Sequence, residues 1–285
     1  MNLDGALTVI NETLEAEFAL RKRHPERDTI YDDHKRRSAI VRAGGECMLD
    51  QRYGAGPRCL LDVFPAGDHS PVLFFVHGGY WRALDKSYVS FIAEPFRGAG
   101  FTVIIPGYDL VPLVRVGEIV DQIRAAFNWV VERMTPERVV VAGHSAGGQL
   151  AAMLALDQAV AGDGPIVGLA SISGVFDLRP LLRTSINADL MLSAEEAAAA
   201  SPLLRLKTLA QDAALVPLLG IVGGDETSGF KQWTADFVAS WRGRGAPAEF
   251  SEMAGRNHFT ILDALAQPDG ELLRGIGALA RDGAA

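Results

Sequence analysis

Cysteine is scarce in this chain of 285 residues. Cys47 and Cys59 are the only two, too few for a disulfide framework and without the clustered Cys/His spacing of a zinc site. A long apolar run is also lacking, and the first residues are acidic where a secretion signal would carry basic residues before an apolar stretch. We therefore expect a cytoplasmic protein with two reduced thiols and no membrane partner.

An excess of positive charge is missing as well. The chain has 27 Lys and Arg against 35 Asp and Glu, a formal net charge of −8. Negative charge opposes the release of counterions that drives binding to a phosphate backbone. We therefore expect no nucleic-acid partner and a small-molecule substrate, while the sequence leaves open whether the chain forms a homodimer.

Apolar residues are plentiful, and their spacing predicts an α/β protein. Hydrophobic residues make up 48% of the chain, enough for one large core. Helical stripes at 116–131 and 230–241 alternate with short apolar runs, which predicts a mostly parallel central sheet covered by helices on both faces. The predicted strands are Cys59–Phe64, Val72–Val76, Phe101–Ile105, Val139–Ala142, Ile166–Ile172, Leu218–Val222 and Ala248–Ser251.

Two segments stand apart from this alternation, although we expect residues 1–285 to form a single domain. The N-terminal extension, about 1–45, begins with apolar residues at helical spacing between Leu3 and Phe18. The stretch 21–42 has eight basic and four acidic residues and poor periodicity, so we predict a solvated loop or short helical pieces, some of which could border an active-site mouth. The second segment, about 176–214, is interpreted as a small cap over the site.

The pentapeptide Gly143-His144-Ser145-Ala146-Gly147 is the strongest chemical signal in the chain. It follows the predicted strand Val139–Ala142 directly and precedes a helical run. A Gly-x-Ser-x-Gly sequence in this context is typical of a sharp turn that exposes a nucleophilic serine at a helix N-terminus. Ser145 is therefore the candidate nucleophile.

A serine hydroxyl needs a base to remove its proton, and a carboxylate to orient that base. In the α/β-hydrolase arrangement the order along the chain is nucleophile, acid, histidine, and His258 is the only histidine after Ser145. Asp225 ends the apolar strand at 218–222 and is the favoured acid. Glu226 is the alternative, because sequence reasoning cannot resolve one residue in a loop.

The sequence His77-Gly78-Gly79-Tyr80-Trp81 follows the predicted strand 72–76. Amides of successive glycines are unobstructed, so those of Gly78 and Gly79, with that of Ala146, are the predicted donors to an oxygen that gains negative charge. We interpret His77 as structural. Tyr80 and Trp81 are candidate substrate contacts, and for Trp81 a buried core indole is an equally good interpretation.

These motifs resemble the arylformamidase (kynurenine formamidase) branch of the hormone-sensitive-lipase-like α/β-hydrolases. The resemblance extends from about Tyr53 to the loop of His258. It rests on HGGYWR at 77–82, YDL at 108–110 with Pro112, GHSAGG at 143–148, ISG at 172–174 with Asp177 and Leu178, Ser201-Pro202, and GGDE at 223–226.

The resemblance implies an α/β-hydrolase fold and hydrolysis of an N-formyl arylamine such as N-formyl-kynurenine, a step of tryptophan breakdown that yields the amine and formate. It implies Ser145 as nucleophile, Asp225 as acid, His258 as base, and neither metal nor organic cofactor. One alternative keeps this machinery in a carboxylesterase for short acyl esters. A second is a binding protein on a hydrolase scaffold, which usually lacks a member of the triad.

Overall fold

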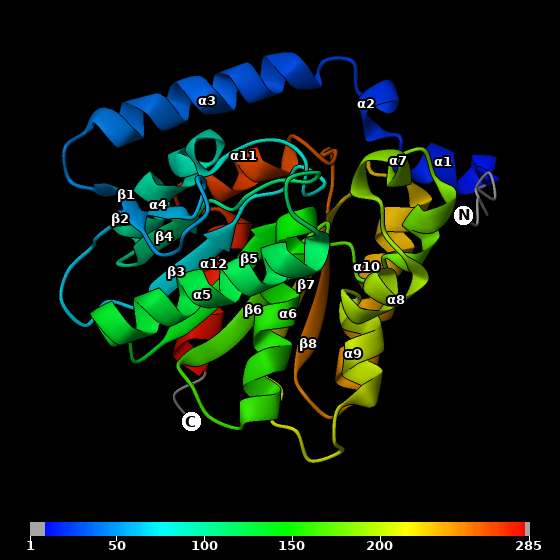
Figure 1. The fold of residues 1–285 in the computed structure, drawn as a ribbon. Coiled ribbons are helices and arrows are strands. Elements are labelled where there is room, and N and C mark those ends of the chain that lie inside the picture. Colours follow the sequence, from blue (N-terminus) through cyan, green and yellow to red (C-terminus); the bar gives the residue numbers. More distant parts are fainter. Residues whose placement is uncertain (1–8, 283–285) are drawn as a thin grey trace.

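The computed structural model describes residues 9–282, which fold around one eight-stranded sheet (Figure 1). The strand order is β1-β2-β4-β3-β5-β6-β7-β8, with β2 antiparallel to both neighbours and parallel pairing from β4 to β8. The strands are β1 Met48–Arg52, β2 Leu60–Phe64, β3 Val72–Val76, β4 Thr102–Pro106, β5 Val139–His144, β6 Ile166–Ile172, β7 Leu218–Gly223 and β8 Ala248–Met253.

Helices cover both faces of the sheet, as the alternating pattern predicts. The α-helices are α1 Glu12–Phe18, α2 Leu20–Arg23, α3 Arg27–Ala43, α4 Ala93–Gly98, α5 Val116–Met134, α6 Ala146–Ala161, α7 Asn187–Leu190, α8 Ala194–Ala199, α9 Pro202–Thr208, α10 Ser228–Arg242, α11 Ile261–Leu265 and α12 Glu271–Asp282. Three short 3-10 helices are η1 Lys86–Tyr88, η2 Ser90–Ile92 and η3 Arg179–Arg183. Among the residues described, no helix is both long and apolar enough to cross a bilayer.

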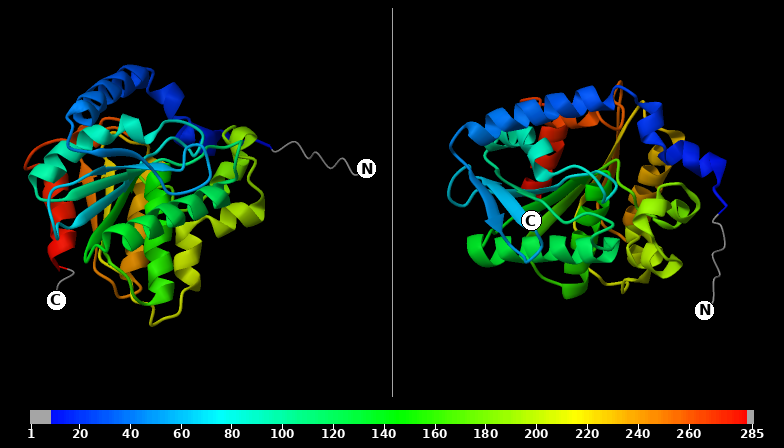
Figure 2. Two further views of the ribbon diagram at one scale, coloured as in Figure 1. Left: turned by 60° about the vertical axis from the view of Figure 1, so that its left-hand side comes forward. Right: turned by 45° about the horizontal axis from the view of Figure 1, so that its top comes forward.

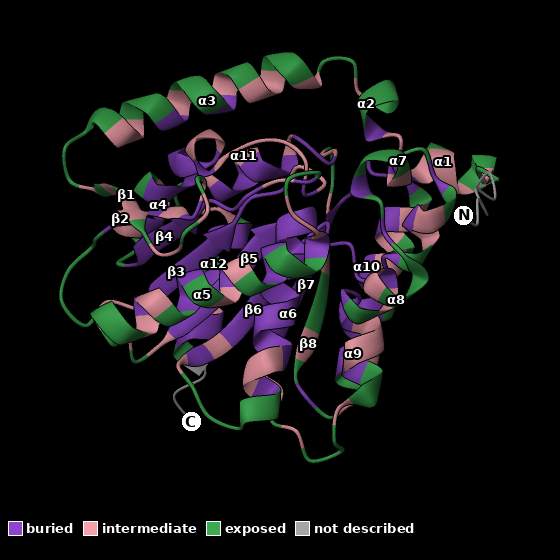
Figure 3. Ribbon diagram, viewed as in Figure 1, coloured by how far each residue is buried: buried purple, intermediate pink, exposed green. Residues whose placement is uncertain are grey.

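The core has two layers because successive side chains of a strand point to opposite faces. In β3, Phe74 packs into the layer shared with α5, α6 and α10, and Phe75 into the layer shared with α4, α11 and α12. The central strands and most of α6 are buried (Figure 3). The predicted strands all exist within one or two residues. The edge strand β1 escaped prediction because its residues are half-buried or exposed and mostly polar.

The predicted loop or short helical pieces at 21–42 are instead mostly one helix, α3, of 17 residues. Figure 2 shows it lying across the top of the molecule in both views. The helix docks through polar residues one turn apart: Ser38 Oγ accepts the Phe91 amide at 3.0 Å, and His34 Nε2 lies 3.0 Å from Asp263 Oδ1. Apolar periodicity is weak because the buried stripe is polar. The predicted helix from Leu3 to Phe18 is described only as α1, and Leu3 and Leu7 lie outside the described residues.

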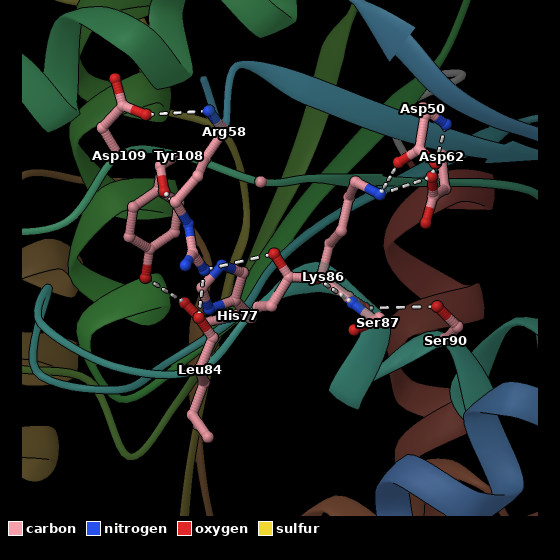
Figure 4. A network of polar contacts seen from close by, with 12 residues as sticks. Asp50, Arg58, Asp62, His77, Leu84, Lys86, Ser87, Ser90, Tyr108 and Asp109 are labelled. Atoms are coloured by element: carbon pink, nitrogen blue, oxygen red, sulfur yellow. Dashed lines mark hydrogen bonds and ion pairs between the residues drawn. The ribbon is translucent and has the colours of Figure 1, made fainter. Parts of the chain in front are cut away.

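A buried ion cluster ties α3 to the edge of the sheet. Lys86 Nζ lies 2.8 Å from Asp62 Oδ1 and 2.6 Å from Asp50 Oδ1 (Figure 4), and Arg42 at the end of α3 also contacts Asp62. The Asp62 side chain is fully buried and that of Lys86 is 5% exposed. A buried carboxylate that loses a partner keeps its desolvation cost, so each cation matters to stability.

We predict that Lys86→Met lowers the free energy of unfolding by about 3 kcal/mol, because Asp62 then stays buried with Arg42 as its remaining cation. Urea unfolding monitored by tryptophan fluorescence measures the change. Glu46→Gln is the control, since the Glu46 side chain is 76% exposed in its pair with Arg97 and its loss should cost less than about 1 kcal/mol. Equal, small losses of unfolding free energy in both variants would contradict the proposed contribution of the cluster to stability.

Candidate active site

Ser145 lies at a sharp turn between β5 and α6, with φ 56° and ψ −120°. Its amide donates to the Ile172 carbonyl at 2.8 Å, which joins the turn to the neighbouring strand. A Cβ at Gly147 would lie 2.0 Å from the Val76 carbonyl oxygen, and one at Gly143 would lie 2.2 Å from that of Gly147. Only glycine permits these approaches. The close packing at these two glycines surrounds Ser145 and keeps its backbone in a strained conformation.

His258 lies in the loop between β8 and α11, and its side chain is buried. The neighbouring Asn257 shapes this loop, because its Oδ1 accepts the amides of Phe259 and Thr260, both at 2.9 Å. The His258 ring presents Nδ1 to a carboxylate at 2.6 Å. With its proton on Nδ1, the imidazole keeps Nε2 free to accept another.

The carboxylate that faces His258 is Glu226 and not Asp225, so the structure does not place the favoured acid beside the imidazole and places the alternative there. The Glu226 amide donates to the Gly223 carbonyl at 3.1 Å, and this tight turn sends Asp225 into solvent. The next residue, Glu226, points back into the protein, where its Oε2 lies 2.6 Å from Nδ1 of His258. The direction of the turn decides between adjacent acids.

Glu226 is held by two further donors. Its Oε1 accepts the Gly223 amide at 2.8 Å and the hydroxyl of Ser173. Ser173 is buried and has φ 51°, just beyond the end of β6. The sequence analysis assigned Ser173 no role, although the motif Ile172-Ser173-Gly174 marks its position. Two charge-assisted hydrogen bonds and the imidazole satisfy a carboxylate that would otherwise be buried alone.

His144 connects the serine turn to the histidine loop. Its Nε2 donates to the His258 carbonyl at 2.8 Å, and the two ring centroids are 4.7 Å apart. Burial lowers the pKa of His144 well below its ordinary value, with the charge of His258 acting in the same direction. A neutral His144 therefore serves as a donor that holds the His258 loop against the serine turn.

Ser145 and His258 line one cavity of about 420 Å³. Its inner wall also includes His144, Gly79, Tyr80, Ala83, Leu84, Tyr88 and Phe259. The outer wall comes from the N-terminal segment, with Leu20, Arg21, Arg27, Asp28, Tyr31 and Asp32. The segment 176–214, which we expected to cap the site, contributes none of these lining residues. Its helices α7, α8 and α9 lie beside α1 and α10 (Figure 1).

The predicted oxyanion donors are not equally placed. Gly79 and Tyr80 line the cavity, and Ala146 begins α6, where an amide has no acceptor within its helix. Gly78 is instead pressed against the serine turn: a Cβ there would lie 2.8 Å from the His144 carbonyl oxygen and 3.1 Å from Ser145 Cβ. Of the predicted donors, Gly79 therefore lies at the cavity wall and Ala146 at the start of α6, whereas Gly78 packs against the serine turn.

Of the two aromatic candidates, Tyr80 lines the cavity and Trp81 does not. The Trp81 side chain is fully buried, and its Nε1 donates to Gln149 Oε1 at 3.0 Å. The prediction of Trp81 as a substrate contact is therefore wrong, and its indole is a core residue with a satisfied hydrogen bond. The Tyr80 hydroxyl donates to the Phe18 carbonyl at 3.1 Å, which ties the loop to α1.

His77 braces the loop from below. Its ring stacks on Tyr108, with centroids 4.3 Å apart, and the Tyr108 hydroxyl donates to the His77 carbonyl at 2.9 Å (Figure 4). His77 Nδ1 donates to the Gly78 carbonyl at 2.8 Å, whereas Nε2 has no partner among the described residues. Burial lowers the pKa of His77 to about 4. The imidazole is therefore neutral and structural.

The arrangement provides the groups for nucleophilic attack on a carbonyl carbon. A sharp turn presents an alcohol at the wall of the cavity, an imidazole borders the same cavity, and a buried carboxylate orients that imidazole. Main-chain N–H groups at the cavity wall can donate hydrogen bonds to the carbonyl oxygen as it becomes negative.

Comparisons with known proteins agree with this chemistry. Residues 73–262 match the family described as alpha/beta hydrolase fold. Kynurenine formamidases of Danio rerio and Salmo salar are both 29% identical to this chain, the first over 79% and the second over 80% of each sequence. The crystal structure of a candidate thioesterase from Silicibacter sp. TM1040 superposes with a TM-score of 0.83 at 31% identity, covering 93% of this chain and 98% of that one. The predicted fold class and the resemblance to the arylformamidase branch are confirmed.

We predict that Glu226→Gln lowers kcat by roughly 10⁴-fold, because an amide no longer stabilises the imidazolium and favours the wrong tautomer. Asp225→Asn, one residue away and exposed, should stay within about twofold of the unchanged protein. Hydrolysis of p-nitrophenyl acetate measures both. The reverse ranking would return the acid role to Asp225.

We also predict that stability falls as the pH drops from about 6.5 to about 4. His77 has a folded pKa of about 4, below the ordinary unfolded value, so the unfolded chain takes up the proton first. This contributes about 2 kcal/mol of lost stability between pH 7.5 and pH 5. Urea unfolding at both pH values should show a loss that is smaller by this amount in His77→Asn. His69→Asn, at an imidazole 86% exposed, is the control; an unchanged pH dependence in His77→Asn contradicts the account.

Proposed function

Because the chain belongs to the alpha/beta hydrolase fold family and is a hydrolase, we propose that it cleaves the amide of an N-formyl arylamine to give the amine and formate. One observation carries the proposal: a chain that is similar to kynurenine formamidases over four-fifths of its length also has a candidate nucleophile, base and acid. N-formyl-kynurenine, an intermediate of tryptophan breakdown, is the proposed substrate type.

In the first half of the proposed reaction, Ser145 Oγ attacks the formyl carbon as His258 Nε2 removes its proton. The Nδ1–H of His258 donates to Glu226, which stabilises the positive charge on the ring. The carbonyl oxygen becomes negative and is bound by the amides at the cavity wall. His258 then protonates the departing nitrogen, and the C–N bond breaks. An aryl nitrogen leaves readily because its electron pair is delocalised into the ring.

The second half repeats the same steps with water. His258 removes a proton from a water molecule, whose oxygen attacks the formyl ester of Ser145. The C–O bond to the serine then breaks, the proton returns to Ser145 Oγ, and formic acid leaves and loses its proton to solvent as formate. Each proton passes through His258, so this chemistry requires no metal or organic cofactor.

A carboxylesterase for short acyl esters uses the same residues and differs in the acyl group it accepts. The two functions separate in the ratio of kcat/KM for N-formyl-kynurenine to that for p-nitrophenyl butyrate. We predict that the formamide is preferred, and a large preference for the ester would overturn the formamidase proposal.

Ser145→Ala should reduce turnover of the formamide by about 10⁶-fold, because the nucleophile is lost. The control is Ser240→Ala, at a serine on α10 outside the cavity. A fluorophosphonate probe, with mass analysis of the labelled peptide, should modify Ser145 in the unchanged protein. Failure to label would favour a binding protein that retains the fold without catalysis.

A further inference from the structure

The outer wall of the cavity carries both signs of charge. Arg21, Arg27, Asp28 and Asp32, here called the charged wall, face the same space as Ser145 and His258. Two cations and two anions balance, so the wall is matched neither to an apolar acyl chain nor to a purely anionic group. All four residues precede the range 73–262 that matches the hydrolase family.

The charged wall is held in place by α3 and the turn before it. Asp28 and Asp32 are one helical turn apart, and Arg27 Nη1 donates to the Arg21 carbonyl at 2.9 Å. Further along α3, Arg37 Nη1 lies 2.7 Å from Asp263 Oδ1 on α11, the helix that follows the His258 loop. The wall is therefore anchored to the part of the chain that carries the base.

The charges of the wall are available to a ligand. The ion pair within it, Arg27 Nη2 to Asp28 Oδ2, is long at 3.3 Å, and the Asp28 side chain is 73% exposed. Such exposed pairs contribute little in water and exchange readily for a better partner. Arg27 is 21% exposed at its side chain, so its guanidinium is half-buried yet reachable from the cavity.

Aromatic rings connect the charged wall to the nucleophile. The Tyr31 ring, on α3, meets Phe259 edge-on at 5.5 Å and Tyr88 at 6.3 Å. Phe259 in turn meets the His258 ring at 5.6 Å. The cavity thus passes from reactive groups through aromatic side chains, which suit an aryl ring, to charges of both signs.

We propose that the charged wall binds the α-amino-acid group of the substrate, with a guanidinium on the carboxylate and Asp28 or Asp32 on the ammonium. The inference rests on the proposed function and specifies its substrate as a zwitterionic N-formyl arylamine, whose formyl end reaches Ser145. A planar guanidinium suits a carboxylate because it donates two parallel hydrogen bonds. A substrate that carries only a negative charge would have no cationic group of its own to pair with Asp28 and Asp32.

The test compares two formamides in the full chain: N-formyl-kynurenine, which carries the amino-acid group, and formanilide, which lacks it. Arg27→Met and Asp32→Asn should each lower kcat/KM for N-formyl-kynurenine at least tenfold, mainly through a higher KM. Both variants should leave kcat/KM for formanilide within about twofold. The matched controls are Arg36→Met and Asp33→Asn, which alter an exposed ion pair of α3 that does not line the cavity.

Equal losses on both formamides in Arg27→Met would overturn the inference, because the residue would then act on the site as a whole. Unchanged kinetics in both wall variants would also overturn it. Thermal unfolding and fluorophosphonate labelling of Ser145 show whether each variant is folded and has a reactive nucleophile. Failure of the proposed function looks different: the unchanged protein would then hydrolyse p-nitrophenyl butyrate and neither formamide.

Discussion

A Cβ atom at residue 147 would lie 2.0 Å from the carbonyl oxygen of Val76, and this closeness of β3 to the start of α6 shapes the whole site. It brings the loop after β3 against the serine turn, so that amides from two distant stretches can face one oxygen. Ser145, two residues before Gly147, has a positive φ of 56°. Strain also gathers in the facing loop, where Tyr80 and Trp81 both have positive φ. The packing of the surrounding sheet and helices offsets that strain.

The neutral, buried imidazole of His144 links the serine turn to the His258 loop. His144 is neither the nucleophile nor its base, yet its Nε2 holds the His258 carbonyl and keeps two segments separated by more than a hundred residues together. Glu226, which accepts a hydrogen bond from Ser173, contacts Nδ1 of the His258 ring. The base is thereby supported by side chains from three different strand ends, which explains how a residue on a loop can be placed accurately.

The N-terminal segment shows how a polar helix can complete an apolar fold. One face of α3 supplies Tyr31 to the cavity, then His34 and Ser38 to buried hydrogen bonds, and finally Arg42 to the ion cluster. His34, Ser38 and Arg42 each have a polar partner, so the most buried positions of the helix are polar. Docking through specific hydrogen bonds fixes the rotation of the helix, and that rotation places the charged wall at the cavity that Ser145 also lines.

The sequence alone determined the fold class, and it was enough to predict Ser145 and His258, which the structure places at one cavity, as candidate nucleophile and base. Strand periodicity, a glycine-flanked serine and a single downstream histidine are local or ordinal signals that do not depend on packing. The tertiary structure decided the features that depend on the direction in which a side chain points. The turn after β7 selects Glu226 over Asp225, a hydrogen bond to Gln149 holds Trp81 in the core, and polar docking turns the 21–42 segment into the wall of the cavity. Neighbouring residues can point to opposite sides of a loop, and only the contacts of the folded chain determine which side each takes.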